Sequence, residues 1–168
     1  VYLQWIIINH GSERRGITFI EQKIVQGLVK IAKGNTKALQ VGNLYAKRDL
    51  GHAKDYVYGM YLMLQQEKPD DYVLATGETH SVKDIINIVA KILKLEIEWS
   101  GKGMDEKAKL KGNGYVIVEV NEKYFRPSEV DILIGDASKA RKELGWEPTY
   151  TLEKMLEEMI HAEFRTSK

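Results

Sequence analysis

The sequence predicts an α/β protein in which short strands alternate with amphipathic helices. Apolar runs of strand length recur along the chain, most are followed by residues at helical spacing, and glycine or proline stands at many of the junctions. Strands that alternate with helices favour a layered α/β architecture. The 168 residues fit one domain, or a large piece of a bigger one, and exclude two full enzyme domains. No internal repeat, low-complexity tract or interdomain linker is evident.

The first strand and helix are predicted near the start of the chain. Residues 3–9 are typical of a short buried strand, which should stop at Asn9-His10 and open into a basic, glycine-bounded loop. Thr18 and Glu21 have the spacing of a capping box, which predicts that a helix begins there. We expect its apolar stripe at Ile20, Ile24, Leu28 and Ile31. Gly34 is expected to end the helix.

The middle of the chain repeats this pattern. Residues 38–42 predict a short strand, and residues 47–52 are interpreted as a polar connector before a second helix. Residues 72–75 predict another strand, and Ser81 is a candidate cap for a third helix. The apolar side of the second helix is expected to carry Val57, Met60, Tyr61 and Leu64.

The last third begins with alternating residues over 95–99, which indicate a half-buried strand. Residues 100–114 are rich in glycine and charge, and we expect a mobile surface loop there. Residues 115–120 predict a strand, followed by a polar connector over 121–131. Two helices complete the prediction: a short one capped by Asp136 and ending at Leu144-Gly145, and a last one starting at Thr151.

Composition restricts the possible partners. Twenty-five Lys and Arg oppose 24 Asp and Glu, a net charge of +1, so no global basic field exists to bind a nucleic acid or an anionic membrane. The chain has no cysteine, which excludes disulfides and thiolate chemistry and fits a cytoplasmic protein. The apolar run Ile6–Ile8 is far too short to span a membrane. The chain starts with Val1 rather than Met, which suggests a segment of a longer product.

Basic side chains form three islands in predicted loops or at helix starts. Planar guanidinium groups suit bidentate contact with phosphate, so a diphosphate is a natural ligand if the islands converge. Asn9-His10 follows a predicted strand, which is where open α/β sheets bind ligands, although a hydrogen-bonded structural role for the histidine is equally open. The islands are Arg14-Arg15 with Lys23, Lys47-Arg48, and Lys123 with Arg126.

Three other constellations are weaker. Asp49, His52 and Asp55 lie three residues apart, but we interpret Asp49 as a helix-entry cap and reject a metal cluster, so no metal site is predicted. Tyr150 and Lys154 match the Tyr-x-x-x-Lys spacing of short-chain dehydrogenases, yet no glycine-rich dinucleotide motif accompanies them, so we interpret the match as coincidence. Glu129 and Asp131 share a face of an extended segment and could bind ligand hydroxyls.

Several blocks, in order and at these distances, resemble the GDP-mannose 4,6-dehydratase family over nearly the whole chain. Leu144-Gly145-Trp146 with Pro148 is shared more broadly by extended short-chain dehydrogenases that act on sugar nucleotides. The specific blocks are Asn9-His10 through Arg14-Arg15-Gly16, Gly42-Asn43-Leu44, Ala46 to Asp49, Gly51 to Val57, Ala75 to Glu78, His80 to Val82 and Tyr124 to Asp131.

The resemblance implies the C-terminal part of a Rossmann-type enzyme: one partial unit over residues 1–168, containing the last strands of the NADP-binding sheet and most of a smaller α/β substrate domain. It implies that the amino-terminal half, with the catalytic residues, is absent, so no catalytic residue is expected in this segment. It also implies a homo-oligomer, either a dimer or a tetramer. By residue match, His10 and Arg15 would contact NADP, and Asn9, Lys23, Arg48, Arg126 and Glu129 would surround GDP-mannose.

One departure affects the loop that carries the arginine pair. The family usually has Glu-Ser-Pro before the two arginines, whereas this chain has Gly11-Ser12-Glu13. Losing the proline frees the backbone, so the placing of Arg14 and Arg15 is open. Two alternatives also stay open: a segment of another sugar-nucleotide epimerase, reductase or dehydratase, and a non-catalytic binding or assembly module.

Overall fold

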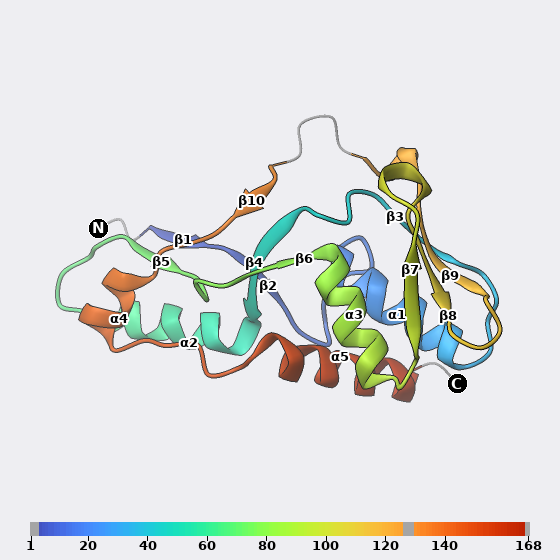
Figure 1. The fold of residues 1–168 in the computed structure, drawn as a ribbon. Helices are drawn as coiled ribbons and strands as arrows, with labels where there is room; N and C mark the ends of the chain where they lie inside the picture. Colours follow the sequence, from blue (N-terminus) through green and yellow to red (C-terminus); the bar gives the residue numbers. More distant parts are fainter. Residues whose placement is uncertain (1–3, 126–129, 167–168) are drawn as a thin grey trace.

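A computed structural model describes residues 4–125 and 130–166 and confirms the α/β class (Figure 1). The strands are β1 Trp5–Ile7, β2 Asn9–Gly11, β3 Leu39–Val41, β4 Lys47–His52, β5 Tyr72–Leu74, β6 Thr79–Ser81, β7 Ile97–Ser100, β8 Lys107–Leu110, β9 Val116–Val120 and β10 Ile132–Leu133. The helices are α1 Ile20–Ala32, α2 Ala53–Leu64, α3 Val82–Ile92, α4 Ser138–Leu144 and α5 Leu152–Thr166, with 3-10 turns η1 Gly103–Asp105 and η2 Glu122–Tyr124.

Within the described residues the strands form three small sheets. β1 pairs with β5 in parallel, and β3, β9, β8 and β7 form a second sheet in that order. In the third sheet β4 lies between β2 and β10, both parallel to it, and also pairs with antiparallel β6. The predicted first strand is therefore two strands, because the chain changes partner at Ile8, from β5 to β4.

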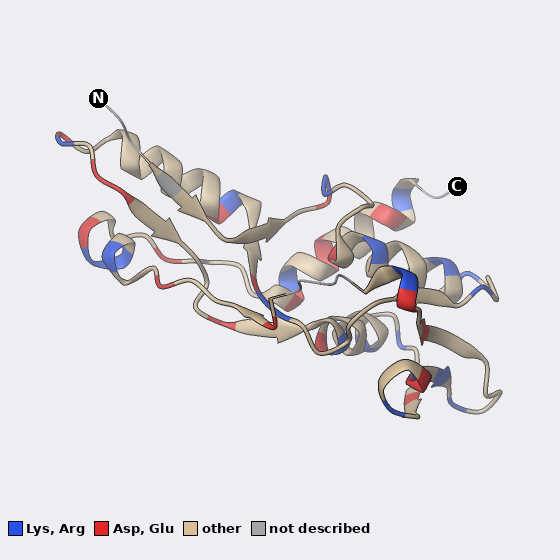
Figure 2. Ribbon diagram, turned by 90° about the horizontal axis from the view of Figure 1, so that it is seen from above, with Lys and Arg blue, Asp and Glu red and all other residues tan. Residues whose placement is uncertain are grey.

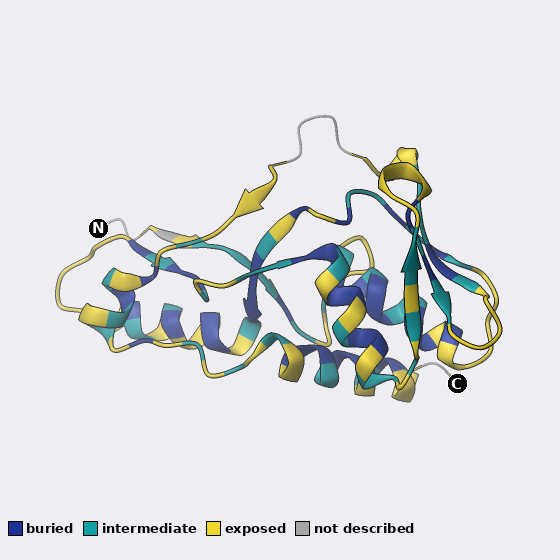
Figure 3. Ribbon diagram, in the orientation of Figure 1, coloured by how far each residue is buried: buried dark blue, intermediate teal, exposed yellow. Residues whose placement is uncertain are grey.

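Two hydrophobic cores flank β4. The larger core joins the buried faces of α1, α3 and α5 to the sheet of β3, β7, β8 and β9, and Figure 3 shows the buried positions along these helices. The smaller core packs α2 and α4 against β5 around Trp146, which is fully buried. The predicted stripe of α1 is confirmed, with Ile24 and Leu28 0% exposed.

The central strand β4 contradicts the prediction of a polar connector over 47–52. Its buried polar residues are Asp49 and His52, and distant segments supply their hydrogen bonds. The Asp49 carboxylate accepts from the backbone N–H groups of Thr76, Gly77 and Gly135 and from the Thr76 hydroxyl. Asp49 is therefore no helix cap. The cap of α2 is His52, whose Nδ1 accepts from the backbone N–H of Lys54.

The exposed face of α2 also differs from the prediction. Val57, Tyr61 and Leu64 were expected in the core but are 62%, 56% and 62% exposed. The helix instead turns Gly59 inward, where an added Cβ would lie 2.7 Å from a Leu74 methyl. A close approach through glycine thus sets which face is buried.

Helix starts were predicted with mixed success. Ser81 forms the expected capping box on α3, with Asp84 as the reciprocal partner. Thr18 does not cap α1, which begins at Ile20 without a side-chain cap. Asp136 accepts from the Ser138 N–H, but the cap position of α4 is Ala137. The predicted glycine stops are confirmed at Gly34 and Gly145, which have φ of 94° and 62°.

Residues 100–114 are not a loop alone, because they contain η1 and β8. β8 lies between β7 and β9, with Ala108 fully buried. Nearby, the buried Glu106 carboxylate accepts from the Tyr45 hydroxyl at 2.7 Å and from Lys83 Nζ at 2.6 Å. Burial alone would raise the pKa of Glu106, but these hydrogen bonds outweigh it and hold the pKa below its ordinary value. The network ties η1 to the loop between β3 and β4.

Candidate functional site

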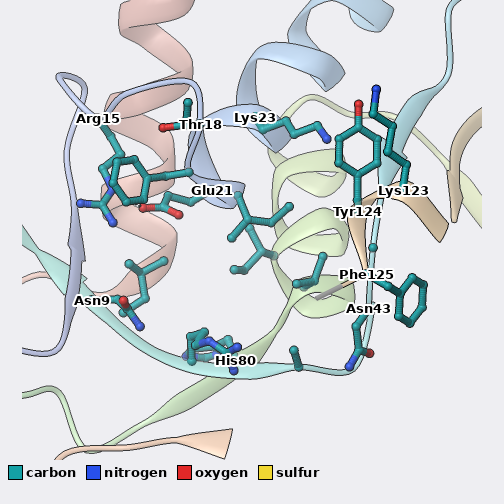
Figure 4. A pocket seen from close by; sticks show the side chains of 18 residues that line it. Asn9, Arg15, Thr18, Glu21, Lys23, Asn43, His80, Lys123, Tyr124 and Phe125 are labelled. Carbon is teal, nitrogen blue, oxygen red and sulfur yellow. Dashed lines mark hydrogen bonds and ion pairs between the residues drawn. The ribbon is translucent and has the colours of Figure 1, made fainter. Parts of the chain in front are cut away.

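A pocket of about 420 Å³ lies beside β4, and segments far apart in the sequence form its walls (Figure 4). This volume is within the range of about 300–1,000 Å³ that is usual for small-molecule sites. β2 and β4 form one side, the start of α1 a second, and α3 with the loops after β3 and β9 the rest. The lining includes Asn9, Arg15, Phe19, Glu21, Lys23, Gly42, Asn43, Arg48, His80, Lys123, Tyr124 and Phe125.

The pocket gathers cations from all three basic islands. Among the described lining residues, the cations are Arg15, Lys23, Arg48 and Lys123, and the one carboxylate is that of Glu21. Charges of both signs are spread over the rest of the chain (Figure 2), in keeping with the net charge of +1. The positive charge of this pocket is therefore a local property, and it favours an anionic ligand.

Lys23 reaches the pocket from the first turns of α1. Its Nζ lies 3.5 Å from the centre of the Tyr124 ring, a cation–π contact that fixes the ammonium group. Partial burial lowers the pKa of Lys23 from its ordinary value, so an anion beside it would favour the charged form. Tyr124 comes this close because position 42 is glycine: an added Cβ at Gly42 would overlap the Tyr124 carbonyl.

Arg48 lines the pocket from β4. Its Nη1 donates to the backbone carbonyls of Lys47 at 2.8 Å and Val130 at 2.6 Å. These bonds hold the guanidinium against the backbone that follows β9. His80, which faces Arg48 across the β4–β6 pairing, also lines the pocket.

Not every predicted site residue lies in this pocket. Asn9 lines it from β2, but His10 points elsewhere and stacks on Tyr56, with ring centres 5.3 Å apart. Burial raises the pKa of the Tyr56 phenol, and the nearby carboxylates of Asp49 and Asp55 raise it further. Arg126 and Glu129 lie outside the described residues.

The rejected constellations have structural roles in the described chain. Asp55 accepts from the Thr149 hydroxyl and from the N–H groups of Thr149 and Tyr150, which ties the approach of α5 to α2. The Tyr150 ring stacks on His52 at 4.1 Å. In residues 4–125 and 130–166 no three histidine or acidic side chains are gathered closely enough to hold a metal ion.

Sequence reasoning missed part of the lining. His80, Phe19 and the pair Tyr124-Phe125 were not proposed as site residues, although the aromatic pair directly follows Lys123. Aromatic residues next to a basic island would have been the signal.

Over the described ranges, the structure has no helix with the length and apolar character needed to cross a membrane.

Two solved structures have the same fold over nearly all of this chain. The structure of RMD from Pseudomonas aeruginosa complexed with NADPH matches 98% of this chain and 48% of its own length, with a TM-score of 0.78 and 17% identity. The dTDP-glucose 4,6-dehydratase of Bacillus anthracis in complex with NAD gives a TM-score of 0.73 at 16% identity, over 97% of this chain and 44% of its own. The chain therefore has the Rossmann-type α/β fold of about half of such an enzyme.

Relatives found by sequence identify the family more narrowly than the shared fold does. GDP-mannose 4,6 dehydratase of Drosophila melanogaster is 49% identical over 94% of this chain and 40% of its own length. GDP-mannose 4,6-dehydratase of Vibrio cholerae serotype O1 is 47% identical over 97% of this chain and 46% of its own length. The chain therefore spans less than half the length of these two relatives. The family model described as GDP-mannose 4,6 dehydratase matches residues 2–159. On this evidence the chain belongs to the GDP-mannose 4,6-dehydratase family.

Proposed function

We propose that this chain is the carboxyl-terminal, substrate-binding part of a GDP-mannose 4,6-dehydratase, an NADP-dependent lyase that converts GDP-mannose to GDP-4-keto-6-deoxymannose. The observation that carries the proposal is the convergence of Arg15, Lys23, Arg48 and Lys123 on one pocket in a chain of net charge +1. A nucleoside diphosphate sugar supplies the negative charge that such a pocket favours.

Lys23 and Arg48 would both contact the diphosphate, with Asn9 donating or accepting at the sugar. Arg126 and Glu129 are assigned to the diphosphate and ribose by their match to the family pattern alone. Each charge-assisted hydrogen bond contributes about 1.5–3 kcal/mol. Two or three of them, together with contact to the aromatic rings at the pocket mouth, support a dissociation constant in the micromolar range, which corresponds to roughly −8 kcal/mol.

The residues present also suit part of an NADP site. Arg15 is a cation of the pocket lining that the buried Glu21 carboxylate holds in place, and its guanidinium suits contact with a phosphate. His10 is assigned to NADP by its match to the family pattern alone. The chemistry that bound NADP supplies is removal of hydride from C4 of the mannose and its return to C6, with loss of water across C5 and C6 in between. We assign the catalytic side chains to a part of the enzyme outside this chain, so the segment alone is expected to be inactive.

The two hydrophobic cores support a division of the chain into a cofactor-binding part and a substrate-binding part. We assign the smaller core, with β1, β5, α2 and α4, to the cofactor-binding domain and the larger core to the sugar-nucleotide domain. The pocket lies along β4, where the two parts meet, so both would contribute to one site.

Calorimetric titration of the folded chain tests the binding proposal. GDP-mannose and GDP are expected to bind with micromolar affinity, and UDP-glucose at least tenfold more weakly. Equal binding of UDP-glucose would favour another sugar-nucleotide enzyme, and no heat at millimolar GDP-mannose would remove the claim of a retained site. The chain alone should give no 4-keto product from GDP-mannose with NADP, and product should appear only after an amino-terminal half is added.

A second candidate is an assembly module, and one observation favours it. In the described chain β1 pairs only with β5, and α2 carries the exposed apolar residues Val57, Tyr61 and Leu64. Unpaired edges and apolar stripes favour association with another chain, and a homo-oligomer is part of our proposal for the cytoplasmic enzyme. Light scattering separates the candidates: a stable monomer that binds GDP-mannose would contradict the assembly module.

A further inference from the structure

Arg15 is held on two sides before any ligand arrives. Its Nε donates to Glu21 Oε1 at 2.7 Å, and its guanidinium carbon lies 3.5 Å from the centre of the Phe19 ring. The arginine side chain is 17% exposed and the glutamate side chain 4%. Figure 4 shows the guanidinium and the carboxylate side by side at the pocket wall. The ion pair uses the Nε edge, so it does not engage the Nη atoms that suit bidentate contact with phosphate.

The end of β2 lies beside the Glu21 carboxylate. An added Cβ at Gly11 would lie 3.6 Å from Glu21 Oε1, an ordinary contact distance, and 3.3 Å from the sulfur of Met155. Position 11 is thus a backbone position from which a second side chain could reach the place that the Glu21 carboxylate occupies.

The same contact explains why the predicted capping box does not form. A capping-box glutamate at position 21 would reach back to the backbone N–H of Thr18. In the structure the Glu21 side chain is buried against Arg15 instead, and α1 begins at Ile20. The Glu21 carboxylate therefore accepts from Arg15 and does not cap the start of α1.

We propose that Glu21 is the positioning residue for Arg15. The ion pair holds the arginine side chain in one conformation against Phe19, so a bound phosphate does not have to order it. The role of Arg15 toward a ligand rests on the proposed function, whereas the ion pair does not.

The test moves the carboxylate between the two positions in the full 168-residue chain. Glu21→Ala removes it, and Gly11→Glu combined with Glu21→Ala restores one from β2. Gly11 has no positive φ, so a glutamate is compatible with its backbone, and the alanine opens the space that the new side chain needs. Glu13→Ala removes an exposed carboxylate of the same loop and is the matched control.

The primary readout is the Arg15 Nε–H resonance in a ¹H–¹⁵N NMR spectrum without ligand, identified by its absence in Arg15→Lys. It should be resolved and slow to exchange with water in the parent chain and in the control. Glu21→Ala should lose it, and the double variant should regain it. An unchanged resonance in Glu21→Ala, or no recovery in the double variant, would overturn the proposal.

Affinity for GDP is the second readout. Glu21→Ala should weaken it about three- to tenfold, and the double variant should recover most of the loss. If the resonance responds as expected but the parent chain does not bind GDP, the proposed function fails and the positioning role stands. Should Glu21→Ala not fold, Glu21→Gln keeps the shape, and faster exchange of the Arg15 Nε–H is expected. An unchanged exchange rate there would also contradict the proposal.

Discussion

Asp49 is predicted to be the most sensitive single polar group in the fold. Its carboxylate is 0% exposed and accepts four hydrogen bonds: Oδ1 from the N–H and the hydroxyl of Thr76, and Oδ2 from the N–H groups of Gly77 and Gly135. These bonds hold two distant turns against β4, the strand that carries Arg48. Asp49→Asn keeps the size of the side chain but turns one of the two acceptors into a donor.

The magnitude follows from the donors left unsatisfied. In either orientation of the amide, two donors of these part-buried hydrogen bonds lose their acceptor, and each unsatisfied group costs about 1–3 kcal/mol. We therefore expect Asp49→Asn to lower the free energy of unfolding by about 2–6 kcal/mol, a large share of the ~5–15 kcal/mol typical of a domain.

Urea denaturation followed by tryptophan fluorescence measures this effect, with the fully buried Trp146 as an internal probe. Asp105→Asn is the matched control, because Asp105 is exposed in η1 and should change stability by less than about 0.5 kcal/mol. A loss for Asp49→Asn as small as that of the control would refute the hydrogen-bond reasoning.

Three further predictions concern the pocket and pH. Lys23→Met should weaken GDP binding by about 10- to 150-fold in calorimetry, because it removes one charge-assisted contact, whereas Lys30→Met on the exposed side of α1 should not. Gly42→Ala should weaken the same binding, because its Cβ would push the Tyr124 carbonyl out of place. The lowered pKa of Glu106 contributes stability that is complete above about pH 4.5 and is lost as the pH falls through the lowered value, so Glu106→Gln should flatten that loss in acid denaturation curves.

Each of these predictions has its own contradictory outcome. Equal losses of affinity for Lys23→Met and Lys30→Met would show a general charge effect and no pocket contact. Parent-like GDP affinity in Gly42→Ala would show that Tyr124 does not shape the site. If Glu106→Gln has the same acid transition as the parent, the Glu106 carboxylate does not contribute to the pH dependence of stability.

Amphipathic periodicity was enough to predict α1, α3 and α5, because their buried stripes read directly from the sequence. The face of α2 could not be predicted, because nearly every residue after Asp55 is apolar and only the approach of Gly59 to Leu74 selects the buried side. β4 was missed because its polar residues look solvated until the distant donors that satisfy Asp49 are known.

The site shows the same limit. The three basic islands were visible as candidates for a diphosphate site, and the structure brings Lys23, Arg48 and Lys123 to one pocket as that hypothesis requires. The buried pairing of Arg15 with Glu21 was not visible, because Glu21 also fits a local capping pattern. Local patterns predict local contacts, and only the fold decides which of two partners a side chain takes.

The central claim is that one anionic ligand contacts separate cationic segments at the same time. An NMR titration of the ¹⁵N-labelled chain with GDP tests it most directly. The account predicts that the backbone amides of Asn9, Lys23 and Asn43 shift together along one binding curve, while those of the distant helix α4 stay in place. Shifts confined to one segment, or curves with different midpoints, would contradict a shared pocket.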